Sequence, residues 1–314
     1  MSHVALFTLE SLLLALGAVL LGSGIGQLAR RLGASAWAVG LVVVPLAVAA
    51  PVFAVTINTP IQERYNFTLG MILGSTVVNV GFALGTAAIL RPMVGSSRFV
   101  SSTISVLLVA VLLFWFVCRD SVVSRVDTII LLAGFVAAVA YLVWVAKEEP
   151  ELAKAPFEAW SIRRWPVWIA VPVALLGIGA LVGGAWLIVP EAVQISRLQP
   201  RSSPHLFGFL TVVLASSLAL LWVTECAARN RHADLAIGTV AVANLCNLLL
   251  LPAVAALVAP FGVANVTLMN DIPATALITF LLLVPFLNGL QISRLEGFIL
   301  LTASAVYIAW QLRR

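Results

Sequence analysis

The sequence predicts an all-α membrane protein of ten transmembrane helices, arranged as two inverted five-helix repeats. Three observations support this prediction. The 314 residues are 62% hydrophobic and only 10% charged, with a mean hydropathy of +1.10, whereas a soluble domain carries about a quarter charged residues. The apolar residues fall into runs near the roughly 20 residues that a helix needs to cross a bilayer. One interrupted apolar hairpin occurs twice, at equivalent places of the two halves.

The apolar runs divide the chain into two halves of five spans each. The first run lacks the basic start of a signal peptide, so we expect a retained helix. We expect the first repeat at 1–146, a hydrophilic linker at 147–165 and the second repeat at 166–314. The ten spans are expected at about 5–29, 36–58, 67–90, 100–118, 126–146, 166–195, 206–228, 234–258, 272–290 and 295–312.

The interrupted hairpin covers about residues 36–90. Pro45 and Pro51 lie inside its first apolar run, and its second run carries Gly74, Ser75 and Asn79. Helix breakers and small polar groups need a reason in lipid, because no water is present to satisfy the backbone groups they free. Broken spans at corresponding places of two halves are typical of a transporter site.

A second copy of this hairpin covers about residues 204–258. It aligns with the first without a gap at a shift of 168 residues. Such a register over about forty residues indicates duplication. Because each half has an odd number of spans, the second half must enter the membrane in the opposite direction. The matched pairs are Gly70 with Gly238, Asn79 with Asn247 and Thr56 with Thr224.

Charge is confined to the loops, which excludes some classes of protein and orients the chain. The net charge of +5 comes from loop arginines and not from a basic face, so we expect no nucleic-acid partner. Eleven cations follow odd-numbered spans and seven lie on the opposite side. The positive-inside rule then places both termini outside. The membrane is expected to be the inner (cell) membrane of a prokaryote.

No catalytic or cofactor motif is present in the sequence. Cys118, Cys226 and Cys246 have no metal-ligand spacing and are expected to be buried thiols. The sequence contains no nucleophile–base–acid set and no phosphate-binding loop. We therefore expect a protein that is not an enzyme and that carries no cofactor.

The two hairpins resemble the alpha-repeats of the cation/Ca2+ exchanger superfamily, which includes the sodium/calcium exchangers. The lead-in LARRLGASAWAVGL, Pro51 and the run Gly70, Gly74, Ser75 and Asn79 match the family pattern in the first copy. The second copy matches at Ser216, Ser217, Gly238, Asn244 and Asn247. The resemblance implies the exchanger fold over nearly the whole chain, and secondary active exchange of inorganic cations (Ca2+, Na+ or H+) by alternating access.

The sequence departs from the family at the two charged ligands. Val52 and Leu220 stand where the family carries the glutamates that coordinate Ca2+. Ca2+ is usually coordinated by about six to eight oxygen atoms, some of them from carboxylates, so these replacements weaken the expectation of a Ca2+ site. Glu225 lies about 140° round a helix from Leu220 and is expected to pair with Arg229.

Two further acids are expected to lie at span boundaries. Asp234 is expected to cap the eighth span, because a helix N-terminus favours an acid. Asp271 is expected to open the ninth span. Neither acid falls at the expected midplane site.

The polar residues that remain within the two hairpins predict an ion site at the membrane midplane that is formed by uncharged side chains. Two alternatives stay open for its members, because asparagines can bond across helices and serines can bond to their own helix backbone. The chain is then either an exchanger-type cation transporter or a membrane protein that keeps the fold without the site. The predicted ion-binding residues are Ser75, Asn79, Ser216, Ser217 and Asn247, with Thr56, Thr224 and Asn244 as secondary candidates.

Overall fold

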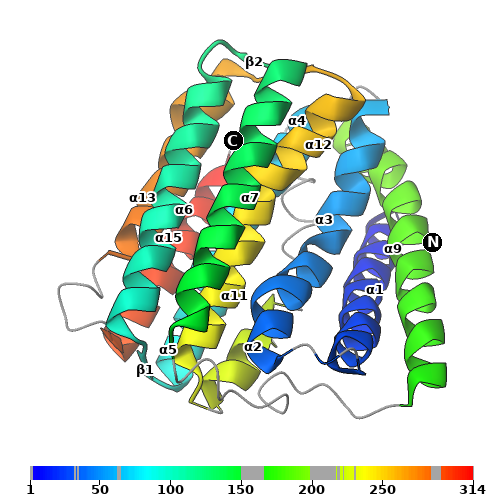
Figure 1. Ribbon diagram of the computed structural model, residues 1–314. Helices are drawn as coiled ribbons and strands as arrows, with labels where there is room; N and C mark the ends of the chain where they lie inside the picture. Colours follow the sequence, from blue (N-terminus) through cyan, green and yellow to red (C-terminus); the bar gives the residue numbers. More distant parts are fainter. Residues whose placement is uncertain are drawn as a thin grey trace.

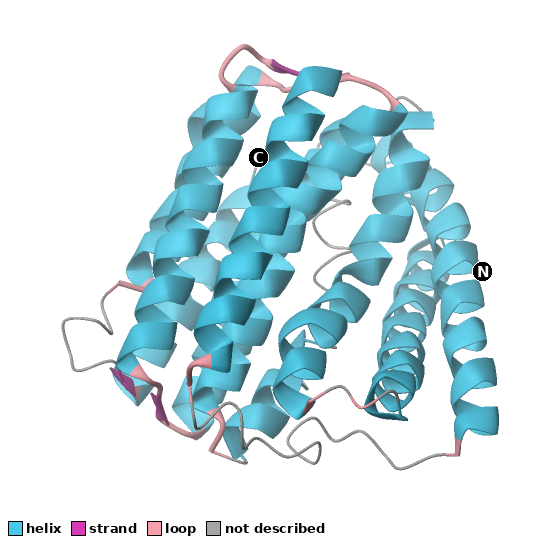
Figure 2. Ribbon diagram, viewed as in Figure 1, coloured by secondary structure: helices cyan, strands magenta, loops and turns pink. Residues whose placement is uncertain are grey.

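The computed structural model is a bundle of long helices with four two-residue strands at its ends (Figures 1 and 2). It describes residues 3–31, 33, 35–61, 65–149, 166–198, 217, 220, 221, 223–229, 231–283 and 291–313.

The first half contains a long helix, an interrupted helical hairpin and two further long helices. Its elements are α1 (His3–Arg31), α2 (Ala36–Ala38), the π-helical turn η1 (Val39–Val43), α3 (Val44–Ile61), α4 (Tyr65–Val78), the π-helical turn η2 (Asn79–Leu84), α5 (Gly85–Leu90), β1 (Met93–Val94), α6 (Ser97–Cys118), β2 (Val122–Val123) and α7 (Arg125–Lys147).

The second half repeats this order where it is described. Its elements are α9 (Val167–Leu198), a helical stretch at 223–229, α11 (Ala233–Leu245), the π-helical turn η4 (Cys246–Leu250), α12 (Leu251–Val258), β3 (Phe261–Gly262), the π-helical turn η5 (Thr267–Asp271), α13 (Ile272–Leu281), β4 (Gln291–Ile292) and α15 (Arg294–Arg313). Residues 150–165 of the predicted linker and most of the seventh span lie outside the described residues.

Several of the described helices can cross a bilayer. Two of the long apolar segments, 68–90 and 233–258, are mostly buried inside the protein, whereas the others turn much of their surface outward. Six segments are long and apolar enough, at Ala5–Ile25, Thr68–Leu90, Arg98–Cys118, Arg125–Lys147, Trp168–Ile188 and Ala233–Val258, and shorter apolar helices lie at Val39–Ala50 and Thr267–Leu281.

The short strands reveal the relation between the two halves. β1 pairs with β4, and β2 pairs with β3, both antiparallel. β1 and β3 are equivalent in the two halves, as are β2 and β4, so exchanging the halves converts one pairing into the other. The two ribbons lie at opposite ends of the bundle (Figure 1). A two-fold axis across the helices produces this arrangement, which confirms the predicted inverted repeats.

The first helices of the two halves, α1 and α9, pack along each other at one side of the bundle (Figure 1). A Cβ atom on Gly17 would lie 2.9 Å from Leu181, and one on Gly24 would lie 2.7 Å from Ala174. Contacts therefore run down α9 as they run up α1, so the helices are antiparallel. The glycines allow the close approach, because any side chain would collide with the neighbouring helix.

A second close contact joins η2 and α5 to α15. A Cβ atom on Gly81 would collide with Ser304, and one on Gly85 would lie 2.8 Å from the Gly297 carbonyl oxygen. Gly81 and Gly85 lie four residues apart on one helix face, a spacing that allows such a contact. Ser304 Oγ also donates a hydrogen bond to the Val77 carbonyl oxygen at 3.1 Å.

The structure corrects the start of the ninth span. The helix already runs through η5, so Asp271 lies inside it and is fully buried. Its Oδ1 atom accepts a hydrogen bond from Gln311 Nε2 of α15 at 2.8 Å. The prediction that Asp271 opens the helix was wrong, because it took Pro273 as the mark of a helix start, whereas the helix already runs through η5 before this proline.

Asp234 also differs from its prediction. It lies in the first turn of α11, but the residue before that helix, His232, makes no side-chain cap. Asp234 Oδ1 instead accepts a hydrogen bond from the backbone amide of Ser96 at 2.7 Å. The carboxylate therefore connects the second half to the loop before α6, and its prediction as a cap was wrong.

Candidate functional site

The two interrupted helices meet in the interior of the bundle. α4 and η2 carry Ser75 and Asn79, and they pack against α11 and η4, which carry Asn244 and Asn247. All four side chains are buried, with at most 2% of their surface exposed. Both asparagines of the repeat, Asn79 and Asn247, lie in π-helical turns. Such turns are frequent at functional sites, because they shift the helix and free backbone groups.

A hydrogen bond connects the halves at this point. Asn79 Nδ2 donates to Asn244 Oδ1 at 2.9 Å, and Asn244 Nδ2 donates to the Thr76 carbonyl oxygen at 3.3 Å. Thr76 and Asn244 are equivalent positions of the two repeats. Equivalent residues can touch only beside the two-fold axis, so the axis passes through this cluster. The structure therefore places Asn79 and Asn244, two of the residues singled out from the sequence, beside the symmetry axis.

Several polar atoms of the predicted site have no hydrogen-bond partner within the described part of the chain. These atoms are Asn79 Oδ1, Asn247 Nδ2, Ser217 Oγ and Thr224 Oγ1, and all are buried. A buried polar atom without a partner costs about 1–3 kcal/mol. Amide nitrogen and oxygen can exchange by rotation, so Asn247 offers either a donor or an acceptor. The site therefore has unused capacity to bind a polar ligand.

The other predicted site residues have mixed outcomes. Thr56 is fully buried, and Ser217 is 4% exposed, as expected for interior positions. Ser216 lies outside the described residues. Ser75 is also buried.

The positions of the two family glutamates are apolar and enclosed. Val52 is 1% exposed and Leu220 is fully buried. Glu225, the nearest acid in sequence to Leu220, pairs with Arg229 at 2.6 Å, as the four-residue spacing predicted. The polar cluster around Asn79 is therefore built from amides, hydroxyls and backbone carbonyls.

Two threonines were not singled out from the sequence as site residues. The Thr76 carbonyl accepts the bond from Asn244, and Thr239 Oγ1 lies 2.7 Å from the Leu235 carbonyl oxygen of its own helix and 3.2 Å from the Gly40 carbonyl oxygen of the other repeat. The repeat alignment could have indicated the contact of Thr76, because it pairs Thr76 with Asn244 and residues beside a two-fold axis can contact their own equivalents. The contact between Thr239 and Gly40 has no such signal, because the two positions are not equivalent.

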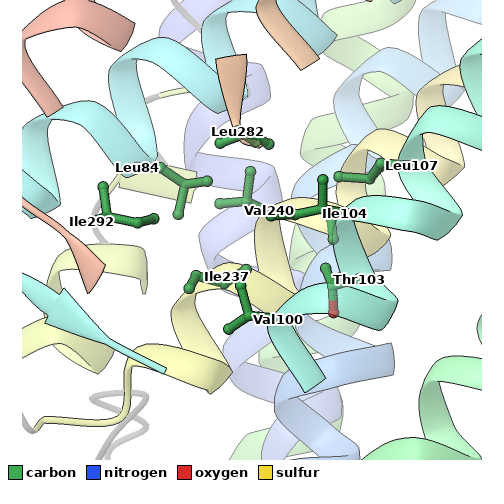
Figure 3. Close-up of a pocket in the computed structure, with 10 residues that line it drawn as sticks. Leu84, Val100, Thr103, Ile104, Leu107, Ile237, Val240, Leu282 and Ile292 are labelled. Carbon is green, nitrogen blue, oxygen red and sulfur yellow. The ribbon is translucent and has the colours of Figure 1, made fainter. Parts of the chain in front are cut away.

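A separate cavity lies between α6, α11 and the end of η2 (Figure 3). Apolar side chains line it, including Leu84, Ile104 and Val240, and its volume is about 10 Å³. The Thr103 hydroxyl is buried there without a hydrogen-bond partner among the described residues. A water molecule needs about 10–15 Å³, so the cavity is too small and too apolar for a coordinated cation.

Comparison with known proteins agrees with this architecture. The model of the family described as sodium/calcium exchanger protein matches residues 2–144 and 169–313. CaxA of Alkalimonas amylolytica is 27% identical over 289 residues, which is 90% of each chain. The sodium/calcium exchanger MaX1 of Methanosarcina acetivorans is 25% identical over 338 residues, covering 94% of this chain and 96% of that one.

A solved structure shows the same fold. The sodium-calcium exchanger NCX_Mj, in crystals soaked with Na+ and Sr2+, superposes with a TM-score of 0.67 and 23% identity, covering 98% of this chain and 97% of that one. The family match extends over both halves, and inverted repeats meet at a buried polar centre. The chain is therefore an integral membrane protein that belongs to the sodium/calcium exchanger protein family.

Proposed function

We propose that the chain is a secondary transporter that moves an inorganic monovalent cation by alternating access at the cluster around Asn79. The observation that supports this most strongly is the unpartnered Asn79 Oδ1, a buried acceptor beside the two-fold axis. A cation needs such oxygens to replace its water. CaxA bears the name putative antiporter and MaX1 the name sodium/calcium exchanger, which supports cation exchange as the type of transport.

The charge of the site favours a monovalent cargo over Ca2+. Moving a monovalent ion into a low-dielectric interior costs about 20 kcal/mol in the idealised Born limit, and the cost rises with the square of the charge, to about four times as much for a divalent ion. Amide and hydroxyl oxygens offset part of the smaller cost. With Val52 and Leu220 at the acid positions, no carboxylate there offsets the larger one.

The antiparallel pair of α1 and α9 is the proposed moving element. It lies at one side of the bundle (Figure 1), and among the described elements it packs mainly against α3 and η1. α3 and η1 contain no charged residue, so the pair can slide along them without breaking ion pairs. Sliding would open the cluster to one side of the membrane and then to the other. The residues proposed to hold the cation are Ser75, Asn79, Ser216, Ser217 and Asn247, with Thr56, Thr224 and Asn244 in support.

The test is ion flux into proteoliposomes that contain the purified full chain. We expect gradient-driven uptake of labelled Na+, Rb+ or H+, and we expect Asn79→Ala and Asn247→Ala to reduce it at least about tenfold, because each removes a ligand worth about 1.4 kcal/mol or more. Thr103→Val is the matched control, because it removes a buried hydroxyl outside the site. No movement of Na+, K+, H+ or Ca2+ under any gradient would overturn the proposal.

A second candidate function is that of a non-transporting membrane protein that keeps the exchanger fold. The direct bond between Asn79 and Asn244 favours it, because this bond ties together the two repeats at the place where an ion would sit. In that case Asn244→Ala would leave the protein as inactive as the wild type. In the transporter, breaking the tie would change the rate of flux.

The membrane orientation is a proposal of its own. The excess of loop cations after odd-numbered spans places both termini outside the cell membrane, with the 147–165 linker on the inner side. Single cysteines introduced at Ser121 and Arg231, which lie in loops at opposite ends of the bundle, should differ in labelling by an impermeant reagent. Only the cysteine at position 121 should react from outside.

A further inference from the structure

A pocket lies at the end of the bundle that carries β1, away from the polar cluster around Asn79. Its volume is about 390 Å³. Arg91 and Met93 line one side, from the loop after α5, and Arg231 and Ala233 line the other, from the loop that enters α11. The pocket is therefore shared by the two repeats, and two arginines line it.

The two arginines are available to an anion. Arg91 Nη1 donates to the Arg229 carbonyl oxygen at 2.8 Å, which holds the two loops together. Within the described residues, neither Arg91 nor Arg231 forms an ion pair with a carboxylate. The nearby acids bond elsewhere, since Glu225 pairs with Arg229 and Asp234 accepts from the Ser96 amide.

A helix N-terminus adds donors to the same pocket. α11 begins at Ala233, a residue of the pocket wall, and His232 before it makes no side-chain cap, while the acid of its first turn, Asp234, accepts a hydrogen bond from the Ser96 amide. The first backbone amides of an uncapped helix point outward and favour a negative charge. Two arginines and a helix start around one hollow together indicate a site for an oxyanion, which guanidinium groups bind with paired hydrogen bonds.

The position of the pocket relative to the membrane indicates the source of that oxyanion. The apolar span at 68–90 ends, and the span at 233–258 begins, at the pocket wall. Leu90 and Val94 beside it are exposed apolar residues, 52% and 64% exposed. This level corresponds to the boundary between lipid chains and headgroups, where basic residues attract anionic lipids. We propose that this pocket binds the phosphate group of an anionic phospholipid and so links the two repeats at one membrane surface.

The test measures lipid binding by the full chain in detergent, by native mass spectrometry. The probes are phosphatidylglycerol, phosphatidylcholine and inorganic phosphate. Because each arginine near a membrane surface contributes about 1 kcal/mol, we expect Arg231→Gln to weaken phosphatidylglycerol binding about fivefold and the Arg91→Gln/Arg231→Gln double variant about thirtyfold. Arg231→Gln breaks none of the contacts described here, so it tests the site even if the double variant folds poorly.

The matched control is the Arg119→Gln/Arg125→Gln double variant, which removes the same charge from the loop at the opposite end of the bundle. It should leave phosphatidylglycerol binding unchanged, and phosphatidylcholine should bind more weakly to every form. Equal losses in the two double variants would show attraction to net charge only and would overturn the proposal. Displacement of phosphatidylglycerol by inorganic phosphate would overturn the lipid as the source and identify a soluble phosphate in its place.

Discussion

At the scale of single residues, the centre of the protein is a pair of amides on the two-fold axis. The sequence indicated Asn79 and Asn247, because they occupy equivalent places in the two repeats. The hydrogen bond in the structure joins Asn79 to Asn244 instead. Asn79 is bonded to a residue three positions before its own equivalent, Asn247, whereas Asn244 is bonded to its exact equivalent, Thr76. Periodicity along one chain predicts the face of a helix but not this offset.

A double-mutant cycle on Asn79→Ala and Asn244→Ala should show a coupling of about 1 kcal/mol in the free energy of unfolding in detergent, because each single variant leaves the other atom of the bond between Asn79 Nδ2 and Asn244 Oδ1 without its partner. Thr103→Ala combined with Asn79→Ala provides the uncoupled comparison. Additive effects for both pairs would mean that the bond between Asn79 and Asn244 contributes nothing to stability.

At the scale of helices, the sequence predicted the contacts that depend on local pattern. The similar Ser124–Asp127 and Ser293–Glu296 segments both begin helices with a reciprocal bond between the serine and the acid. Gly81 and Gly85 lie four residues apart on one helix face, a spacing that allows close packing, and α15 lies against them. The start of the ninth span was wrong, because the partner of Asp271 is Gln311, forty residues away, and no local pattern predicts that pairing.

The repeated helix starts give a prediction about stability. Ser124→Ala and Ser293→Ala should each lower the free energy of unfolding by about 1 kcal/mol, because each removes a side-chain acceptor from the first turn. The two losses should agree, since the two sites are equivalent. Ser101→Ala, which removes an exposed hydroxyl bonded to the Arg98 carbonyl, is the control. A loss at only one of the two sites would contradict the equivalence.

The contact between α1 and α9 gives a prediction about movement. Gly24→Leu should destabilise the protein by about 1–3 kcal/mol and slow transport, because its side chain has no room beside Ala174. Gly183→Leu in α9 is the matched control, since a Cβ atom there meets nothing within 4 Å. Thermal unfolding and flux would be measured on both variants. If Gly24→Leu transported at the wild-type rate, α1 and α9 would not be the moving pair.

At the scale of the whole molecule, the sequence predicted the inverted repeats and the structure confirms them in two independent places. The β1–β4 and β2–β3 ribbons exchange when the halves are exchanged, and Thr76 meets its equivalent, Asn244, at the axis. The symmetry was predictable because a gapless repeat and an odd number of spans require it. The chemistry at the axis was less predictable from the sequence, because Val52 and Leu220 replace the two glutamates by which the family site is recognised.

Introducing glutamates at positions 52 and 220 tests whether the site accepts a monovalent ion, and not Ca2+, because it lacks carboxylates. Labelled Na+ and labelled Ca2+ exchange would be measured side by side in proteoliposomes of the wild type, Val52→Glu, Leu220→Glu and the double variant. We predict that the wild type moves the monovalent ion and not Ca2+, and that Ca2+ exchange appears only in the double variant, where two carboxylates offset the desolvation of a divalent ion. Ca2+ exchange by the wild type at the rate of the double variant would contradict a monovalent site of uncharged ligands.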